Sequence, residues 1–230
     1  MRLLIGGPVP DGVIDDGLTD EEIRAVYEPP RQPWRRVNMV GTVDGAATGE
    51  GGKTGAINNP ADHRVFQLLR RACDAIVVGA GTARAEGYGA ADRPLVLVSR
   101  RGDVPDRLLD APAGAVLLAT CAAAAGLATA RSALGADNVL VLGEDTVDLA
   151  MMRAQLASRG LRTLHSEGGP HLLRDLLAAG VVDELDATVV PRLIAGLHTR
   201  ITAGDGVAVQ LSLAALLEED GTLLARWLVD

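Results

Sequence analysis

Residues 165–173 carry side chains and glycines suited to binding a charged ligand. They read His-Ser-Glu-Gly-Gly-Pro-His-Leu-Leu and follow a short apolar run at residues 161–164. This order predicts a buried strand, a tight turn at Gly168 and Gly169, and a helix opened by Pro170, whose missing N–H costs nothing there. A glycine turn into a helix start presents N–H groups and the helix dipole to an anion, typically a phosphate. An ordinary turn between strand and helix is the alternative interpretation.

A second glycine-rich stretch, residues 47–54, reads Ala-Thr-Gly-Glu-Gly-Gly-Lys-Thr and fits the permissive P-loop pattern. In a P-loop the lysine and threonine begin a helix, so that N–H groups and the lysine converge on phosphates. Residues 55–60 (Gly-Ala-Ile-Asn-Asn-Pro) do not suit the first turns of a helix. We therefore expect a flexible loop near a ligand, and a helix that starts at Pro60 with Asn59 as its cap. A nucleotide-hydrolysing P-loop is the less favoured alternative.

Two further strand ends carry groups suited to a dinucleotide. The apolar run at residues 75–78 leads into Gly-Ala-Gly-Thr at 79–82, although Arg84 stands where the fingerprint has its third glycine. The next apolar run, residues 94–98, ends in Ser-Arg-Arg at 99–101. Serine and arginine at that point suit a ribose 2′-phosphate, whereas an acidic residue would receive a 2′-hydroxyl. These residues favour the phosphorylated dinucleotide, and the alternative is a pair of solvated surface arginines.

Apolar runs alternate with helical patterns along most of the chain, which predicts a mainly parallel, twisted sheet with helices on both faces. A last strand at 223–229, which no crossover helix precedes, is expected to pair antiparallel at an edge. Residues 1–33 form an N-terminal arm with a short helix capped by Thr19, and residues 34–230 form a single domain. The other expected strands are 35–40, 75–78, 94–98, 115–119, 138–142, 161–164 and 184–190. The expected helices are 20–27, 60–73, 122–134, 149–158 and a last one from 170 that ends at Gly180.

The composition describes a globular protein with a substantial core, because 48% of its 230 residues are hydrophobic and 23% are charged. A formal net charge of −8 argues against nucleic acid as the main partner. No apolar run approaches the roughly 20 residues that a membrane span needs. Cys73, Cys121 and four separate histidines give no metal-ligand pattern, so no metal site is expected. We expect a cytoplasmic protein that binds a small molecule.

Several short motifs together form an ordered set that covers most of the chain, from about Arg35 to the C-terminus. The set resembles the pyrimidine reductase domain of riboflavin biosynthesis, a family with the dihydrofolate reductase fold. We expect no zinc deaminase domain of the kind that many bacterial members carry upstream, so the stand-alone members serve as the comparison. In chain order the motifs are Asn38-x-x-x-Thr42-Val43-Asp44-Gly45, Leu69-Arg70-Arg71-Ala72-x-Asp74-Ala75, Val78-Gly79-Ala80-Gly81-Thr82, Glu167-Gly168-Gly169-Pro170 and Val182-Asp183-Glu184-Leu185.

The resemblance implies an NADPH-dependent enzyme that reduces a ribosylamino-pyrimidine phosphate, with hydride delivered to C1 of the ring-opened sugar. Such a site must hold the nicotinamide against the sugar carbon and exclude water. No residue is assigned as an obligatory general acid, and water would supply the proton. The positions implied to bind cofactor are Gly41, Asp44, Gly79, Gly81, Thr82, Glu86, Ser99, Arg100, Gly168, Gly169, Pro170, His171, Leu172 and Leu173. Those implied to bind substrate are Asn38, Thr54, Asn58, Arg70 and Glu167.

The chain departs from the family pattern after Thr82. Many members continue with an Asp-Asp-Pro-x-Leu-Thr-x-Arg run, whose arginine helps to hold the substrate phosphate. Here residues 85–90 read Ala-Glu-Gly-Tyr-Gly-Ala, and Arg93 is the nearest basic residue. This change leaves open a reductase of another heterocycle, such as dihydrofolate or a pterin, on the same scaffold. A non-catalytic nucleotide-binding protein is a further alternative.

The family resemblance also implies a homodimer. Two apolar C-terminal stretches, residues 213–217 and 223–229, would supply its interface. The alternative is that both stretches belong to the core of one subunit.

Overall fold

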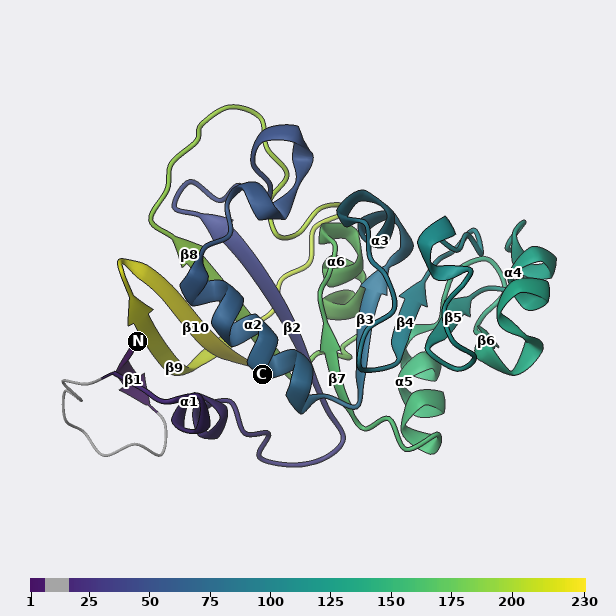
Figure 1. The fold of residues 1–230 in the computed structure, drawn as a ribbon, viewed down its shortest axis with the longest axis horizontal. Helices are drawn as coiled ribbons and strands as arrows, with labels where there is room; N and C mark the ends of the chain where they lie inside the picture. The colour runs from purple at the N-terminus through teal and green to yellow at the C-terminus, as the bar shows by residue number, and fades with distance from the viewer. Residues whose placement is uncertain (7–16) are drawn as a thin grey trace.

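A single sheet organises the molecule, and the computed structural model describes it over residues 1–6 and 17–230 (Figure 1). The described residues form ten strands in the order β1-β9-β10-β8-β2-β7-β3-β4-β5-β6. From β8 to β6 all neighbours are parallel, whereas β10, β9 and β1 continue the sheet with antiparallel pairs. The strands are β1 (Arg2–Gly6), β2 (Trp34–Thr42), β3 (Ala75–Gly79), β4 (Leu95–Val98), β5 (Val116–Thr120), β6 (Val139–Val141), β7 (Thr163–Ser166), β8 (Glu184–Val190), β9 (Leu211–Glu219) and β10 (Thr222–Val229).

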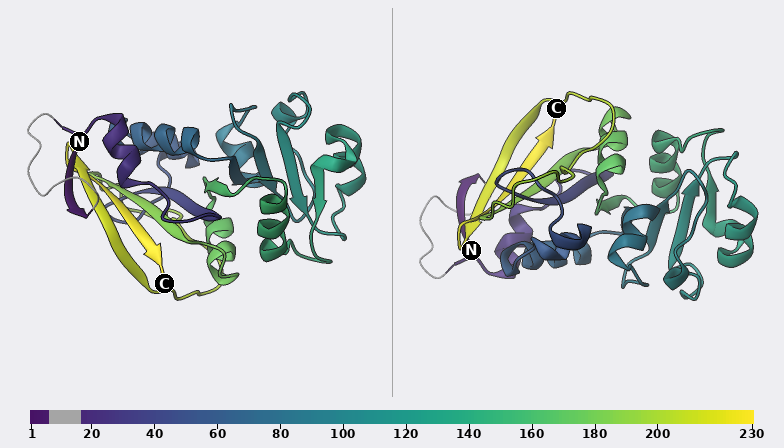
Figure 2. Two further views of the ribbon diagram at one scale, coloured as in Figure 1. Left: turned by 90° about the horizontal axis from the view of Figure 1, so that it is seen from below. Right: turned by 90° about the horizontal axis from the view of Figure 1, so that it is seen from above.

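Helices cover both faces of this sheet, as Figure 2 shows. One face carries α1 (Asp20–Val26), α2 (Pro60–Ala72), α3 (Ala80–Glu86) and α4 (Leu127–Leu134). The other carries α5 (Leu149–Ser158) and α6 (Pro170–Ala178). The fold is therefore the predicted α/β arrangement with an antiparallel group of strands at one side.

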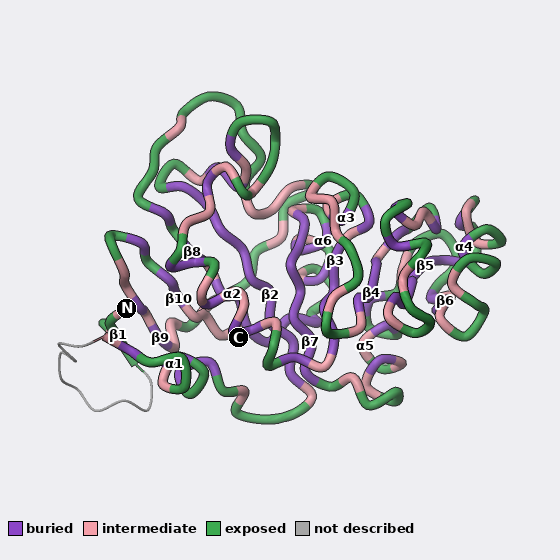
Figure 3. The backbone as a smooth tube through the Cα atoms, viewed as in Figure 1, coloured by how far each residue is buried: buried purple, intermediate pink, exposed green. Residues whose placement is uncertain are grey.

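The central strands are buried on both faces, which explains their unbroken apolar runs (Figure 3). In β3, Val77 packs against α5 and α6, whereas its neighbour Ile76 packs toward α3 and α4. The same alternation follows in β4, where Val96 and Leu95 face the two cores. A strand between two helical layers has no polar face, so these segments are readily recognised from the sequence.

A buried charged layer lies between α1, α2 and the strands β2, β8 and β10. The Glu184 carboxylate receives the indole N–H of Trp34 at 2.9 Å and the Arg226 guanidinium at 2.8 Å. Its other oxygen lies 3.1 Å from Nε of Arg36, a side chain only 2% exposed. Burial and the neighbouring Glu184 raise the pKa of Asp186 well above its usual range. The layer therefore combines one paired carboxylate with one acid whose charged form is disfavoured by burial.

Three elements differ from the sequence-based expectation. The alanine-rich helix predicted at 122–134 begins only at Leu127, because the N–H groups of Ala122 and Ala123 bond to the carbonyls of Gly143 and Glu144 instead. Strand β1 was not predicted; it pairs antiparallel with β9. Strand β9 was not predicted either, although it lies between β1 and β10 in the sheet. Edge pairing of this kind depends on partners distant in sequence, which local patterns do not report.

Other expectations agree with the structure. Helix α2 begins at Pro60, and the Asn59 side chain caps it by accepting a bond from the N–H of Asp62. The P-loop alternative is not supported, because no α-helix begins at Lys53 and Thr54. Lys53 lies between two short 3₁₀ turns. Helix α1 carries a capping box between Thr19 and Glu22.

One face of β9 and β10 is packed against α1 and α2, and at one end of the opposite face Trp227 and Val229 of β10 pack against the core beneath α5 and α6. Leu223 and Val189, paired across β10 and β8, are 39% and 37% exposed there. The homodimer implied by the resemblance would bury these side chains, and it stays a prediction. Within the described residues no helix is both long and apolar enough to span a membrane, and no cluster of three metal-binding side chains occurs.

We expect Glu184→Ala to destabilise the protein strongly, because Arg36 and Arg226 would lose the carboxylate they share inside the fold. The loss in free energy of unfolding should be about 3–5 kcal/mol, the usual range when one partner of a buried pair is removed. Urea denaturation measures it. The matched control is Glu21→Ala, an exposed acid in α1, which should change stability by less than about 0.5 kcal/mol. A loss below about 1 kcal/mol for Glu184→Ala would contradict a stabilising role of this layer.

Candidate active site

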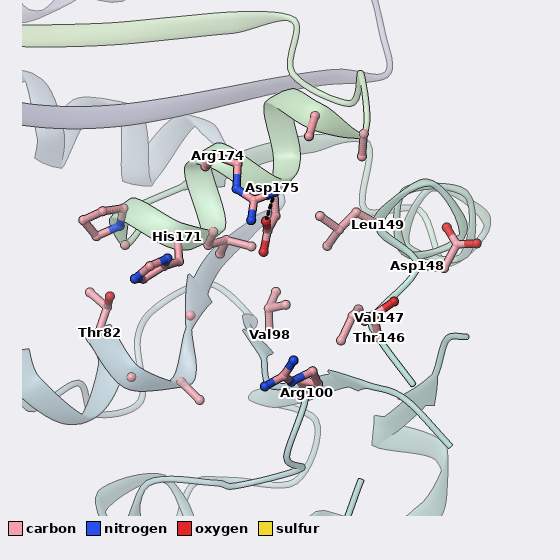
Figure 4. Close-up of a pocket in the computed structure, with 18 of the residues that line it drawn as sticks. Thr82, Val98, Arg100, Thr146, Val147, Asp148, Leu149, His171, Arg174 and Asp175 are labelled. Atoms are coloured by element: carbon pink, nitrogen blue, oxygen red, sulfur yellow. Dashed lines mark ion pairs between the residues drawn. The ribbon is translucent and has the colours of Figure 1, made fainter. Parts of the chain in front are cut away.

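A cleft of about 990 Å³ opens at the carboxyl ends of the parallel strands, the edge at which α/β sheets place their ligands (Figure 4). Its walls come from the β3–α3 junction, the end of β4, the loop before α5, and the first turns of α6. Val98, Val147 and Leu149 supply an apolar wall, and Figure 4 shows Arg100 and Arg174 on opposite sides of the opening. The predicted cofactor residues that line the cleft are Gly79, Gly81, Thr82, Arg100, Gly169, Pro170, His171 and Leu172.

The two-glycine turn lets α6 start directly against β3. Gly168 has φ +82°, and a Cβ on it would lie 2.9 Å from the Met39 sulfur. A Cβ on Gly169 would overlap the Thr82 hydroxyl. The Gly168 carbonyl accepts the N–H of Gly79 at 2.8 Å, which joins the turn to the end of β3. A side chain at either position would force its neighbour to move, so close packing accounts for both glycines.

The groups of the cleft that could attract an anion are the start of α6 and the side chains of Arg100 and Arg174. No side chain caps α6, so its first N–H groups are available to an anion. Arg100 is exposed, and within the described chain its guanidinium makes no ion pair. Arg101 instead turns toward Asp103 at 3.3 Å. Arg174 pairs with the adjacent Asp175 at 3.2 Å. Arg100 is therefore the free cation at the end of β4.

Four of the residues predicted to touch the cofactor have internal partners instead. Ser99 is buried, and its hydroxyl accepts the N–H of Asp103 at 3.0 Å. Leu173 is fully buried in the core beneath α6. Asp44 accepts the Thr42 hydroxyl and also the N–H groups of Ile194, at 3.2 Å, and Ala195, at 2.7 Å. Glu86 accepts the N–H of Thr54 at 2.9 Å. These side chains shape the walls and loops of the site, and their contact with a cofactor stays a prediction.

Gly41 lies near the carboxyl end of β2, where a Cβ would stand 3.4 Å from the Ala46 carbonyl oxygen. It shares this end with Asp44, whose two N–H bonds tie residues 194 and 195 to the β2 turn. The bond from Thr42 and the N–H groups lower the pKa of Asp44, so it stays charged near neutral pH. The loop after β8 is thus fixed beside the loop after β2.

On the other side of the turn, Glu167 is held by three donors. Arg70 binds its two oxygens in a bidentate pair, at 2.5 and 2.8 Å, and the Tyr88 hydroxyl donates to Oε2 at 2.5 Å. The guanidinium of Arg70 lies 4.8 Å from the ring centre of Phe66 and 5.6 Å from that of Tyr88. Arg70 thus lies within cation–π distance of two aromatic rings as well as in a bidentate ion pair, and these contacts together restrict its position.

This arrangement brings together two predicted substrate residues, Arg70 and Glu167, but joins them to each other. The sequence reasoning did not assign a site role to Tyr88, although it singled out the altered loop that contains it. Burial and the Glu167 carboxylate raise the pKa of Tyr88 well above its usual value, so its hydroxyl stays a donor. The available signal for a role of Tyr88 was its place in residues 85–90, where the chain departs from the usual family sequence.

The other predicted substrate residues lie under α2 or at the loop before it. Asn38 is buried in β2 and is level with Asp186 of β8. Asn58 is half-buried, and its Oδ1 accepts the N–H of Asn59 at 2.6 Å. Thr54 is half-buried and is tied through its N–H to Glu86. Asn38 and Asn58 therefore face the same layer between α2 and the sheet, beside the acid Asp62, which the sequence reasoning did not single out.

The fold and the cleft define an α/β protein whose ligand site lies at the carboxyl ends of its parallel strands. The family model described as the RibD C-terminal domain matches residues 33–222. The chain belongs to the RibD C-terminal domain family, and the resemblance read from its motifs is confirmed.

A relative from Methanothermobacter thermautotrophicus, named 2,5-diamino-6-ribosylamino-4(3H)-pyrimidinone 5′-phosphate reductase, is 30% identical over 191 residues, 76% of this chain and 86% of the relative. A pyrimidine reductase-like protein from Corynebacterium diphtheriae has a TM-score of 0.75 at 26% identity, over 86% of this chain and 92% of that one. A Thermotoga maritima deaminase and 5-amino-6-(5-phosphoribosylamino)uracil reductase has a TM-score of 0.66 at 17% identity. That match covers 91% of this chain and 60% of the other, and it shows the fold alone.

We expect His165, beside Glu167, to make the protein sensitive to acid. It is fully buried, and burial together with Arg36 and Arg70 lowers its pKa well below the usual value. Below about pH 6.5 the unfolded chain binds a proton there that the folded chain does not, so stability falls as pH falls. From about pH 7.5 to 5.5 this group should account for a loss of about 1.4 kcal/mol.

Urea denaturation of wild type and His165→Gln at both pH values measures this contribution. The variant should lose correspondingly less stability on acidification. The exposed histidine variant His198→Gln is the control and should retain the pH dependence of wild type. Equal acid sensitivity of His165→Gln and wild type would show that other groups are responsible.

Proposed function

We propose that this protein is an NADPH-dependent reductase of a ribosylamino-pyrimidine phosphate in riboflavin biosynthesis. Membership of the RibD C-terminal domain family supports the reaction class, and the name of the archaeal relative supports the substrate class. The observation that carries the proposal is the turn at residues 167–170. Its glycines and the start of α6 border the large cleft, while Glu167 and Arg70 lie on the other side. Two ligands held there would meet at this turn.

The cleft residues fit NADPH. The uncapped start of α6 suits a diphosphate, and the Cβ-free backbone at Gly79 and Gly81 leaves room for it. The Arg100 guanidinium, free of ion pairs in the described chain, suits a 2′-phosphate. The apolar wall from Val98 to Leu149 suits a ring system. The diphosphate, the 2′-phosphate and one ring system of the dinucleotide thus each have a matching group.

When bound, NADPH would supply the hydride that reduces C1 of the opened sugar. The contribution of the chain is to orient and to exclude water. The Arg70–Glu167–Tyr88 group forms a rigid wall beside the turn, because its charges and rings hold one another in place. No described side chain is required as a general acid in this proposal, since water supplies the proton.

A cofactor-oxidation screen tests the proposal. Purified protein is incubated with NADPH and a panel that contains the diaminopyrimidinone phosphate, its uracil counterpart, dihydrofolate and dihydropterin. Loss of nicotinamide absorbance with a pyrimidine phosphate, together with mass-spectrometric detection of the ribitylamino product, is the expected result. Turnover of dihydrofolate or dihydropterin alone would favour the alternative reductase. The absence of both turnover and NADPH binding would reject the reductase class.

We expect Arg100→Glu to weaken NADPH binding by roughly 10- to 100-fold, the range for losing a bond to a charged group. NADH binding should change by less than about threefold, because NADH lacks the 2′-phosphate that the arginine would contact. Fluorescence titration with both cofactors measures the difference. Arg101→Glu is the matched control, since Arg101 is directed toward Asp103 and does not line the cleft. Equal losses for the two cofactors, or equal effects of the two variants, would remove this role from Arg100.

A further inference from the structure

Five carboxylates are buried in the described chain, and one of them differs from the rest. Glu167, Asp183 and Glu184 each bind an arginine within 3.1 Å. Asp186 lies 3.7 Å from the Arg36 guanidinium. Asp62, only 2% exposed, makes no ion pair within residues 1–6 and 17–230. An acid buried without a counter-ion is costly to the fold, so its presence points to a role in binding.

The Asp62 carboxyl also has an unused acceptor. Its Oδ1 is buried and receives no hydrogen bond from the described chain. Thr188 of β8 and Asn58 face the carboxyl and favour its charged form, while burial raises its pKa overall. A ligand that brings N–H donors would satisfy the oxygen and favour the charged form further.

Asp62 belongs to the same helix face as the group that holds Glu167. Asp62, Phe66 and Arg70 are spaced four residues apart in α2, so they share one face. Phe66 lies against the ring of His165 in β7, 5.9 Å between ring centres, and Arg70 binds Glu167 just beyond β7. This face of α2 therefore crosses the sheet from β8 to β7.

Strand β2 lies between β8 and β7, beneath this face of α2, and the residues of the three strands that face the helix form a strip across the sheet. Asn38 of β2 is level with Asp186, and the β2–β8 register places Thr188 level with Val40, two residues further on. On its other side, β2 pairs Val37 with Ser166 of β7. Asn38 follows Val37 and Glu167 follows Ser166, so Asn38 and Glu167 lie at the same level of the two parallel strands. Asn38 thus stands between the β8 end of the strip, where Asp62 lies, and the β7 end, where Glu167 lies. A planar ring in this layer would have Asp62 at one edge.

The substrates specified in the names of two relatives differ at C2 of the pyrimidine ring. The archaeal substrate is a 2-amino-4(3H)-pyrimidinone, which carries two neighbouring donors, N3–H and the C2 amino group. The Thermotoga name specifies a uracil, in which C2 carries an oxygen acceptor instead. A carboxylate accepts from two adjacent N–H groups at once, but it is repelled by a carbonyl oxygen.

We propose that Asp62 is a specificity-determining residue that binds the N3–H and C2 amino edge of the pyrimidine and so selects the aminopyrimidinone over the uracil. The proposal rests on the reductase function proposed above, because it assigns the substrate to that site. It makes the acid in the first turn of α2 the group that distinguishes an aminated from a deaminated precursor.

Direct binding of sugar-free ring fragments tests this assignment without turnover. Anaerobic calorimetry with 2,5,6-triamino-4(3H)-pyrimidinone and with 5,6-diaminouracil gives the preference of wild type and of Asp62→Asn. Wild type should bind the aminopyrimidinone roughly 10- to 100-fold more tightly, as expected for losing one charge-assisted bond. In Asp62→Asn the preference should vanish or invert, because an amide offers one acceptor and one donor and so matches the uracil edge.

The control is Asp186→Asn, at a buried acid in the same layer whose charged form is disfavoured by burial. It should keep the wild-type preference. Asp62→Ser provides a second variant if the asparagine protein does not fold, which thermal unfolding checks, and it should lose the preference without gaining affinity for uracil. Wild type that binds both fragments equally, or neither, overturns the proposal, as does an unchanged preference in the Asp62 variants or a shift in Asp186→Asn alone.

The outcome is separable from that of the proposed function. A fragment preference that depends on Asp62, with no NADPH oxidation on the full substrates, would reject the reaction and keep the recognition. NADPH oxidation whose ratio between the two full substrates is the same in wild type and Asp62→Asn would keep the reaction and reject the role of Asp62.

Discussion

The tight turn at Gly168 and Gly169 is the constraint on which the site depends. Met39 lies against one glycine and Thr82 against the other, so neither position accommodates a side chain. Because the turn is this tight, the start of α6 opens into the cleft while Glu167, one residue earlier, is buried against Arg70. A single peptide thus separates the surface suited to a dinucleotide from the layer suited to a pyrimidine. A wider turn would move these two regions apart.

Several charged side chains are buried in the interior beside this turn, and the acids among them differ in whether an arginine pairs with them. Glu184 is held by Arg36 and Arg226, and Glu167 by Arg70, so these acids are neutralised within the protein. Paired charges of this kind keep a fixed geometry but cost desolvation. Asp62 makes no ion pair within the described residues, and its Oδ1 receives no hydrogen bond there. The layer thus holds acids that are paired with arginines beside one acid that has no counter-ion.

The sequence predicted those parts of the protein that local patterns determine. The two-sided apolar runs of β3, β4 and β5 and the caps of α1 and α2 follow from neighbouring residues. The edge strands β1 and β9 escaped because their pairing is long-range, and α4 is short because Ala122 and Ala123 bond across to another loop. At the site, the glycine turn was predicted, whereas the joining of Arg70, Glu167 and Tyr88 was not. Motif spacing identifies which residues belong to a site but does not reveal which of them bind one another.

The order of strands in the sheet bears on how this site is assembled during folding. Strands β3, β4, β5 and β6 are neighbours both in the sheet and in the sequence, so their contacts close short loops. The partners of β2 come much later, since Arg35 and Asp183 are 148 residues apart when they pair. Contacts of high sequence separation form slowly because their loop-closure entropy must be overcome first. The layer that contains Asn38, Asp62 and Glu167 straddles these long-range pairs, so it is completed only when β7 and β8 dock on β2.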